Sequence, residues 1–353
     1  MIKNNILQVF IFLCLAFSFQ AQKIRTTVNA YGHFNLESNF LKDTSYANLK
    51  LGEQELFITT RFNDRFSFLG EITTNYLGHG NFRLNFERAR LKYNYYKNHS
   101  FIIGKFHTPV NYWNDVYFHA RLFFPTIDRP LMFSRWIPIH TFGVRMQGQN
   151  IGKNKFGYDV LIGNDMSNED LFSLGRDNSI TAAVHWKPKD ELRFGASYYH
   201  SYISDVSAMA SHHHAHDDSN LYSGSLRFHM ANSSFAYFSE NWEVLNEFSY
   251  VNSTTDSLGM AHNFSNFLYV GKRIKQKNVP FIGLDYIYVD DDDLHSMQTD
   301  VFKFIGGYKY EYSENINIKI QGEYYTQTDS GLMHGTSDVF PKFEFKIQMS
   351  YGF

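Results

Sequence analysis

Apolar and polar residues alternate without a break at the C-terminal end of the chain, and this pattern restricts the fold more than any other feature. The apolar members are Phe343, Phe345, Ile347, Met349, Tyr351 and Phe353, each separated by one small or polar residue. Because successive side chains of a β-strand point to opposite faces, a period of two predicts a strand with one apolar and one polar face. The pattern recurs at residues 316–324, 302–310, 222–230 and 66–76. The chain is therefore predicted to be all-β.

Strands of this kind build either the edge of a soluble sandwich or a closed barrel in a membrane. Each segment has about the ten residues that a tilted strand needs to cross a bilayer. Phe353 is the last residue and follows Tyr351 by two positions, which resembles the terminal signal that the barrel assembly machinery recognises. Counting such segments over residues 25–353 gives about sixteen, an even number as bacterial single-chain barrels require. We therefore predict a transmembrane antiparallel β-barrel of about sixteen strands, surrounded by outer-membrane lipid.

The first residues of the chain have the features of a signal peptide. Lys3 precedes a mainly apolar run over residues 6–17, and Ala21 follows as a small residue suited to cleavage. The run has about twelve residues, well short of the ~20 that a membrane-spanning helix needs. We therefore expect residues 1–21 to be removed on export and residues 22–353 to form a single outer-membrane barrel domain. Cys14, the only cysteine, would leave with the signal peptide, so the mature chain would have neither a disulfide nor a reactive thiol.

The composition excludes several function classes. Aromatic residues make up 18% of the chain and charged residues 19%, with a net charge of −2. No basic segment with interleaved aromatics is present, so we expect no nucleic-acid partner. The motifs G-x-S-x-G and H-E-x-x-H and a glycine-rich phosphate loop are also missing, so we predict that the chain is not an enzyme. A barrel esterase with Ser and His on its outer wall stays open as an alternative.

The longest connection between predicted strands spans residues 107–140. It is rich in Phe, Trp, Pro and Arg, and a loop of this length is normally either functional or disordered. Its aromatic content argues against disorder, because such side chains need a surface to pack on. Short turns alternate with long loops along the chain, which places this one after the fifth strand as the third external loop. Packing on the barrel rim or at a trimer contact is the alternative to folding into the lumen.

Three motifs around this loop resemble a known family. They are residues 86–93 (FERARLKY), residues 104–109 (GKFHTP) and residues 128–130 (DRP) followed by Phe133. They are similar to the phosphate-selective porin O and P family, and the resemblance covers about a fifth of the chain. It implies a sixteen-stranded porin, usually a homotrimer, with an inward-folding third loop and passive diffusion of small solutes. It also implies basic residues that lead anions such as phosphate through the pore. The matching positions are Arg88, Arg90, Lys92, Lys105 and Arg129.

Strand alternation independently supports part of this assignment. If Ala89 and Leu91 face lipid, then Arg88, Arg90 and Lys92 face the lumen as a basic column, with a phase slip and a predicted bulge near Glu87. Guanidinium groups suit oxyanions because their donors form a planar fork. Loop residues would add to the column; these are Arg121, Arg129 and Arg135. The alternative is that the bases pair with lumen acids, for which the candidates are Glu37, Glu55, Glu71, Glu323 and Glu344.

Histidines suggest a second interpretation of the function. His212, His213, His214 and His216 lie in the predicted external loop 203–219, and neutral imidazoles at this density bind Zn²⁺, Cu²⁺ or Ni²⁺. Further histidines are predicted on the same side of the membrane, namely His79, His107, His119, His200, His262, His295 and His334. The alternative function is therefore a channel or receptor for divalent metal ions, whereas the simpler view is a solvated loop that needs no metal. The acidic residues 290–293 lack the spacing of a calcium loop and indicate a solvated tip or a divalent bridge to lipopolysaccharide.

Overall fold

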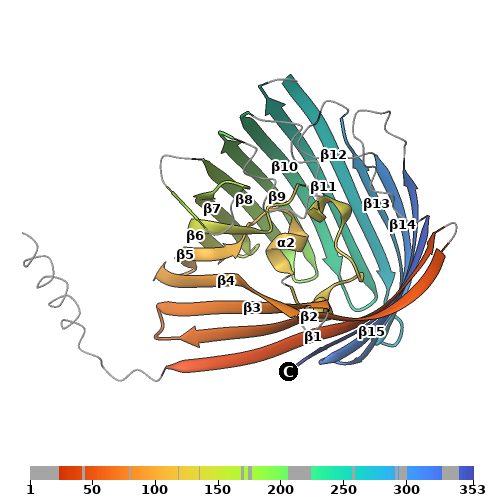
Figure 1. The fold of residues 1–353 in the computed structure, drawn as a ribbon. Helices are drawn as coiled ribbons and strands as arrows, with labels where there is room; N and C mark the ends of the chain where they lie inside the picture. Colours follow the sequence, from red (N-terminus) through yellow and green to blue (C-terminus); the bar gives the residue numbers. More distant parts are fainter. Residues whose placement is uncertain are drawn as a thin grey trace, which may run out of the picture.

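The computed structural model of the chain is a closed antiparallel barrel in which sixteen strands follow one another in sequence order (Figure 1). It describes residues 24–41, 44–78, 81–117, 119–134, 136–167, 171–173, 177–205, 224–256, 259–290, 293, 300–327 and 342–353. The expected signal peptide and Arg135 lie outside these residues, and so do seven of the singled-out histidines, namely His79, His212, His213, His214, His216, His295 and His334. The predicted fold class is confirmed.

Every strand pairs with its neighbours in the chain, and β1 (Arg25–Leu41) closes the barrel against β16 (Phe343–Gly352). The other strands are β2 (Thr44–Arg61), β3 (Phe66–Gly78), β4 (Asn81–Tyr96), β5 (His99–His107), β6 (His140–Ile151), β7 (Phe156–Asn164), β8 (Asn178–Lys189), β9 (Leu192–Ile203), β10 (Leu226–Phe238), β11 (Trp242–Thr255), β12 (Gly259–Lys272), β13 (Asn278–Tyr288), β14 (Val301–Ser313) and β15 (Ile316–Gln327). No strand edge is left free along this ring, which is the condition for a sheet to satisfy its own backbone in lipid.

The alternation along the strands separates an apolar outer face from a polar inner face. On β15, Ile318 and Ile320 are exposed, whereas the intervening Lys319 is fully buried inside the barrel. On β13, Ile282 is 68% exposed on the outer face, and its neighbours on the inner face include the fully buried Asp285. Apolar residues outside and charged residues inside reverse the order found in a protein dissolved in water, and they match a barrel whose outer wall contacts hydrocarbon.

The third long loop folds into the barrel and fills part of it. It contains three short helices, α2 (Tyr112–Val116), η1 (Arg121–Phe123) and η2 (Leu131–Ser134), which lie inside the ring of strands (Figure 1). Backbone N–H groups of the loop donate to side chains of distant strands. They run from Trp113 to Glu247 Oε1 at 2.8 Å, from Ile127 to Gln321 Oε1 at 2.9 Å and from Leu131 to Asp285 Oδ2 at 2.8 Å. The predicted inward folding is confirmed, and packing on the outer rim is wrong for this loop.

An apolar core forms where the loop meets the wall. Trp113, Phe124 and Trp136 of the loop are each 1% exposed, and the Trp113 ring stands edge-on to Phe267 of β12, with 5.5 Å between ring centroids. Burial of side chains of this size contributes about 1.5–3 kcal/mol each. The loop is therefore held by packing as well as by hydrogen bonds.

This core overturns one expectation from the sequence. In a transmembrane barrel, the alternation at 222–230 would place its apolar residues on the lipid-facing surface, but Leu226, Phe228 and Met230 of β10 are buried inside the barrel. Phe228 and Met230 belong to the cluster that packs with the loop. Alternation shows that a strand has two different faces, but which face meets lipid depends on what fills the interior.

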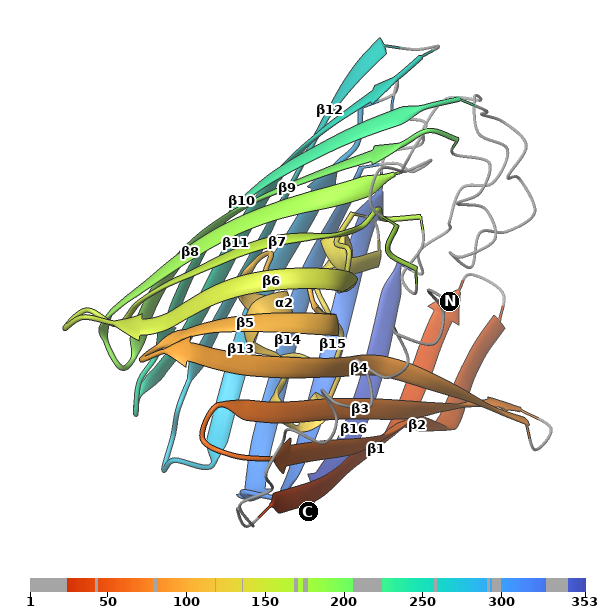
Figure 2. The ribbon, with the colours of Figure 1, turned by 90° about the vertical axis from the view of Figure 1, so that its left-hand side faces the viewer.

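The view turned by 90° shows the loop enclosed, with β4, β5 and β6 passing in front of α2 (Figure 2). Among the described residues, no helix is long and apolar enough to cross a membrane.

Candidate channel constriction

A polar cavity of about 270 Å³ separates α2 from one part of the barrel wall. Its charged lining comprises one carboxylate, Asp115 of α2, and five cations from four strands, namely Arg88, Arg90, Arg145, Lys187 and Arg193. Phe106, His107, Val116, Gln147, Gln149 and His185 complete the lining. The loop therefore leaves an open space on the side of β4 to β9, and this space is bounded mainly by positive charge.

A bulge in β4 turns Arg88 toward the lumen. The register of β3 and β4 shifts between the pairs Glu71↔Arg88 and Ile72↔Phe86, which leaves Glu87 as the extra residue. Both Glu87 and Arg88 are buried, and Arg88 forms an ion pair with Glu71. The bulge predicted from the phase slip at Glu87 is present, and it brings two consecutive side chains inside.

Asp115 ties the loop to the basic wall. It forms an ion pair with Arg193 and lies 3.7 Å from Arg145 Nη2, while Arg145 also bonds Asp159 at 2.7 Å. Burial raises the pKa of Asp115, but Arg193 and Arg145 outweigh that effect and hold the pKa below its usual range. The carboxylate is therefore ionised and anchors α2 to β6 and β9.

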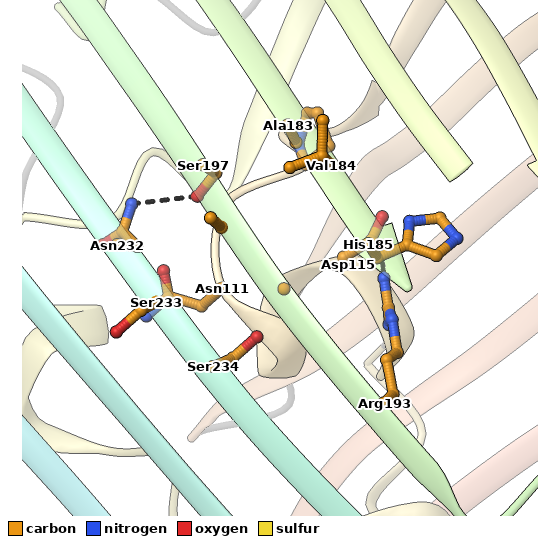
Figure 3. A pocket seen from close by; sticks show the side chains of 13 residues that line it. Asn111, Asp115, Ala183, Val184, His185, Arg193, Ser197, Asn232, Ser233 and Ser234 are labelled. Atoms are coloured by element: carbon orange, nitrogen blue, oxygen red, sulfur yellow. Dashed lines mark hydrogen bonds and ion pairs between the residues drawn. The ribbon is translucent and has the colours of Figure 1, made fainter. Parts of the chain in front are cut away.

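A small recess lies behind this anchor, between α2 and strands β8, β9 and β10. Figure 3 shows Arg193 beside Asp115 and His185, while Asn232 donates a 3.1 Å hydrogen bond to Ser197 on the next strand. The recess holds only about 20 Å³, enough for about one water molecule. It is a packing gap rather than a passage.

Two cations of the larger cavity have no acidic partner among the residues that the structure describes. Within the part of the chain that the structure describes, no salt bridge joins Arg90 or Lys187 to a carboxylate. The partners of the other cations are Glu71, Asp159 and Asp115. Setting these three carboxylates against the five cations leaves a surplus of two positive charges. The cavity therefore carries a net positive charge.

The opposite wall is closer to electrical balance. Lys303 lies between Asp285 at 3.4 Å and Glu323 at 3.5 Å. Lys346 bonds Glu323 at 2.9 Å and also reaches Asp128 of the loop at 2.7 Å. On this wall, lumen bases therefore pair with lumen acids, as the alternative interpretation predicted, and the acids include Glu323 and Glu344. The same holds for two pairs elsewhere in the barrel, Arg88–Glu71 and Lys50–Glu37.

Comparison with known proteins identifies the type of barrel. No protein-family model matches the chain, and no curated protein matches it. Among solved structures, the trimer form of OmpT of Vibrio cholerae superimposes with a TM-score of 0.65 at 13% identity, over 93% of this chain and 99% of that one. An anion-selective porin from Comamonas acidovorans gives 0.65 at 10% identity, over 94% and 100% of the two chains. The outer-membrane channel DcaP of Acinetobacter baumannii gives 0.61 at 12% identity, over 94% and 97%.

This chain has the barrel fold of bacterial outer-membrane porins. At these identities the likeness shows the fold alone, so membership of the phosphate-selective porin O and P family stays a prediction.

The predicted pore residues are only partly brought together. Arg88 and Arg90 line the cavity, and Lys92 lies two residues along β4, where its Nζ donates to Gln147 Oε1 at 3.4 Å. Lys105 is half-buried, pairs with the exposed Ala89 and does not line the cavity.

The predicted loop cations occupy a different place. Arg121 and Arg129 lie over the Phe124 ring, at 4.9 and 5.6 Å from its centroid, rather than in the cavity. Arg135 and the four histidines at 212–216 are not among the residues described.

Three cations of the cavity were missed in the sequence, namely Arg145, Lys187 and Arg193. Each stands next to a large outward residue, since Arg145 precedes Met146, Lys187 follows Trp186 and Arg193 precedes Phe194. The same alternation that marked Arg88 and Arg90 would have placed them inside. What the sequence lacks is the information that these strands and β4 share one space.

Proposed function

We propose that the chain is an outer-membrane porin through which small solutes diffuse passively, with a preference for anions. On this proposal, residues 1–21 direct export, residues 22–353 form the pore, and loop 107–140 is the constriction. The fold shared with outer-membrane porins supports the location and the passive mode of transport.

The observation that carries the anion preference is the surplus of positive charge between α2 and the wall of β4 to β9. A unit charge about 4 Å from an ion in water contributes about 1 kcal/mol. Arg90 and Lys187 have no acidic partner among the described residues there, so their charge is available to a passing solute. Arginine also offers paired donors to an oxyanion, which makes inorganic phosphate a suitable solute alongside chloride.

The comparisons support two further parts of the proposal. One similar structure is described as an anion-selective porin and another as a trimer form, so we infer anion preference and a homotrimer for this chain as well. Diffusion through a pore needs no catalytic residue, and we propose that the protein is not an enzyme. Hydrolysis of an ester by the detergent-solubilised protein would contradict that part.

Single-channel recording in planar bilayers tests the proposal. The purified protein should insert as open channels, and the reversal potential in a KCl gradient should show chloride more permeant than potassium. Adding phosphate should reduce the chloride current, because both anions would compete for the same cations. Absence of conductance, or a preference for potassium, would refute the proposal.

The alternative function, a channel or receptor for divalent metal, rests on His212, His213, His214 and His216, outside the described residues. A zinc current, or a zinc block that disappears when these four residues are replaced, would favour it.

A further inference from the structure

Three histidines converge where the third loop joins the wall. His107 ends β5, His140 begins β6 and pairs with it in register, and His119 approaches from within the loop. All three are buried, and one ligand atom of each lies within 4.8 Å of the others. This is the one group of three or more candidate metal ligands in the described part of the chain.

The distances among these groups match those of a tetrahedral zinc site. His119 Nε2 lies 3.4 Å from His140 Nε2, and Glu87 Oε2 lies 3.6 Å from the former and 3.5 Å from the latter. Ligands at about 2.0–2.1 Å from Zn²⁺ in a tetrahedron are about 3.4 Å apart. The three atoms therefore already form one face of such a coordination shell without being moved.

His107 is the remaining member of the cluster, and a small movement of its side chain would bring a ring nitrogen to the fourth position. Its ring centroid lies 5.0 Å from that of His140 and 5.8 Å from that of His119. Its Nε2 is buried and has no hydrogen-bond partner among the described residues. A buried polar atom without a partner is uncommon and needs an explanation, and a metal ion in the adjacent cluster provides one.

Neighbouring side chains hold the ligands in suitable orientations. Thr73 Oγ1 donates to Glu87 Oε1 at 2.6 Å, which leaves Oε2 directed at the imidazoles. Glu53 Oε2 lies 3.8 Å from His119 Nδ1, beyond hydrogen-bonding distance, and a movement of under about 1 Å would let it accept the proton of a metal-bound histidine. Arg129 Nη2 approaches the same Nδ1 at 3.4 Å. A His119 that binds metal through Nε2 carries its proton on Nδ1, so this nitrogen would no longer accept from Arg129 and would donate to Glu53.

Charged groups of both signs surround the cluster. Four carboxylates and four cations interact with the cluster or with its neighbours. The carboxylates are those of Glu53, Glu55, Glu71 and Glu87, and the cations are Arg88, Lys105, Arg121 and Arg129. Carboxylates therefore lie beside the cluster as well as cations, and the imidazoles and Glu87 supply the metal ligands.

We propose that His107, His119, His140 and Glu87 bind a divalent transition metal, with Zn²⁺ as the best match in ligand type and spacing. The bound metal joins the loop through His119 to β4, β5 and β6. It thereby holds the loop in place beside the ends of β5 and β6 from which the loop starts and to which it returns. The site does not depend on the proposed transport function, because binding is measured without conduction.

Metal binding to the full chain in detergent tests the proposal. The histidine cluster of the external loop is first removed by changing His212, His213, His214 and His216 to Gln, so that it contributes no signal. Titration of this protein with Zn²⁺ should give one site per chain, and Co²⁺ should give the visible absorption of a tetrahedral complex. A protein that binds no Zn²⁺ and gives no such Co²⁺ spectrum would overturn the proposal.

Variants identify the ligands. His119→Gln and Glu87→Gln should each weaken Zn²⁺ binding by more than about tenfold. His99→Gln, at the other end of β5 and bonded to Tyr158 at 2.9 Å, should bind as before. Heat-dependent migration of the barrel in gels shows whether each variant is folded. Unchanged affinity in folded His119→Gln would overturn the assignment, and the Co²⁺ spectrum decides independently if a variant fails to fold.

Discussion

Replacing Arg90 by Gln tests the electrostatic argument most directly. Arg90 lines the cavity between α2 and the wall, and no salt bridge joins it to a carboxylate in the described segments. Its removal leaves every acid of the cavity with its present partner. Replacing Arg88 would instead strand the fully buried Glu71, so a loss of function there would have two explanations.

The structure sets the size of the expected effect. Arg90→Gln lowers the surplus of positive charge in the cavity from two to one. At about 4 Å in water one charge contributes about 1 kcal/mol to the energy of a passing ion, which corresponds to about fivefold in an equilibrium constant. Because the lost charge attracts chloride and repels potassium by about the same energy, the two permeabilities change in opposite directions by about fivefold each. We therefore expect the permeability of chloride relative to potassium to fall about 25-fold.

The assay is the reversal potential of single channels in a KCl gradient, recorded at low and high salt. The Debye length falls from about 10 Å at 0.1 M to about 3 Å at 1 M, so the difference between variant and wild type should shrink as salt rises. Lys153→Gln is the matched control, because Lys153 is exposed in the turn after β6. An Arg90→Gln channel with the wild-type permeability ratio at low salt would refute the reasoning.

Two further predictions concern the outer wall and the loop anchor. Ile282→Lys places a charge on the lipid face of β13, where Ile282 is 68% exposed, and should lower the free energy of unfolding in liposomes by about 2–4 kcal/mol; an unchanged value would contradict a lipid-facing wall. Arg193 and Arg145 hold the pKa of Asp115 low against the effect of burial. The ionised Asp115 therefore stabilises the folded protein fully at pH values above its pKa in the unfolded chain, about 4, and this stabilisation disappears as the pH falls through the lower pKa of the folded state. The difference in Tm between wild type and Asp115→Asn should therefore be largest near neutral pH and should vanish in acid, whereas a constant difference would show that the anchor does not depend on ionisation.

The barrel could be predicted because the alternation of apolar and polar residues along each strand reflects the surroundings of its two faces. A period of two is a local property, and the alternation at residues 316–324 places Lys319 and Ile320 on the faces where the structure has them. The bulge at Glu87 was visible for the same reason, as a slip in that period. The aromatic residues of the loop indicated that it is ordered, because they require a surface to pack on, and its inward position was expected from the resemblance to the porin O and P family.

The remaining features depend on contacts between segments far apart in the chain. The apolar inner face of β10 exists because Phe228 and Met230 meet the loop, and nothing near them in the sequence indicates this. His107, His119 and His140 likewise converge only because the middle of the loop folds back onto the ends of β5 and β6. Alternation assigns a residue to the inside but does not say which other residues share its part of the lumen.

The position of the loop gives the two sides of the barrel different interiors. On the side of β10 to β15 the loop packs directly against the wall, since Trp113 and its apolar neighbours form a buried cluster there. On the side of β4 to β9 the interior is open and basic. Selectivity could therefore be re-engineered on one half of the ring while the other half continues to provide rigidity, an arrangement that a pore centred on the barrel axis would not permit.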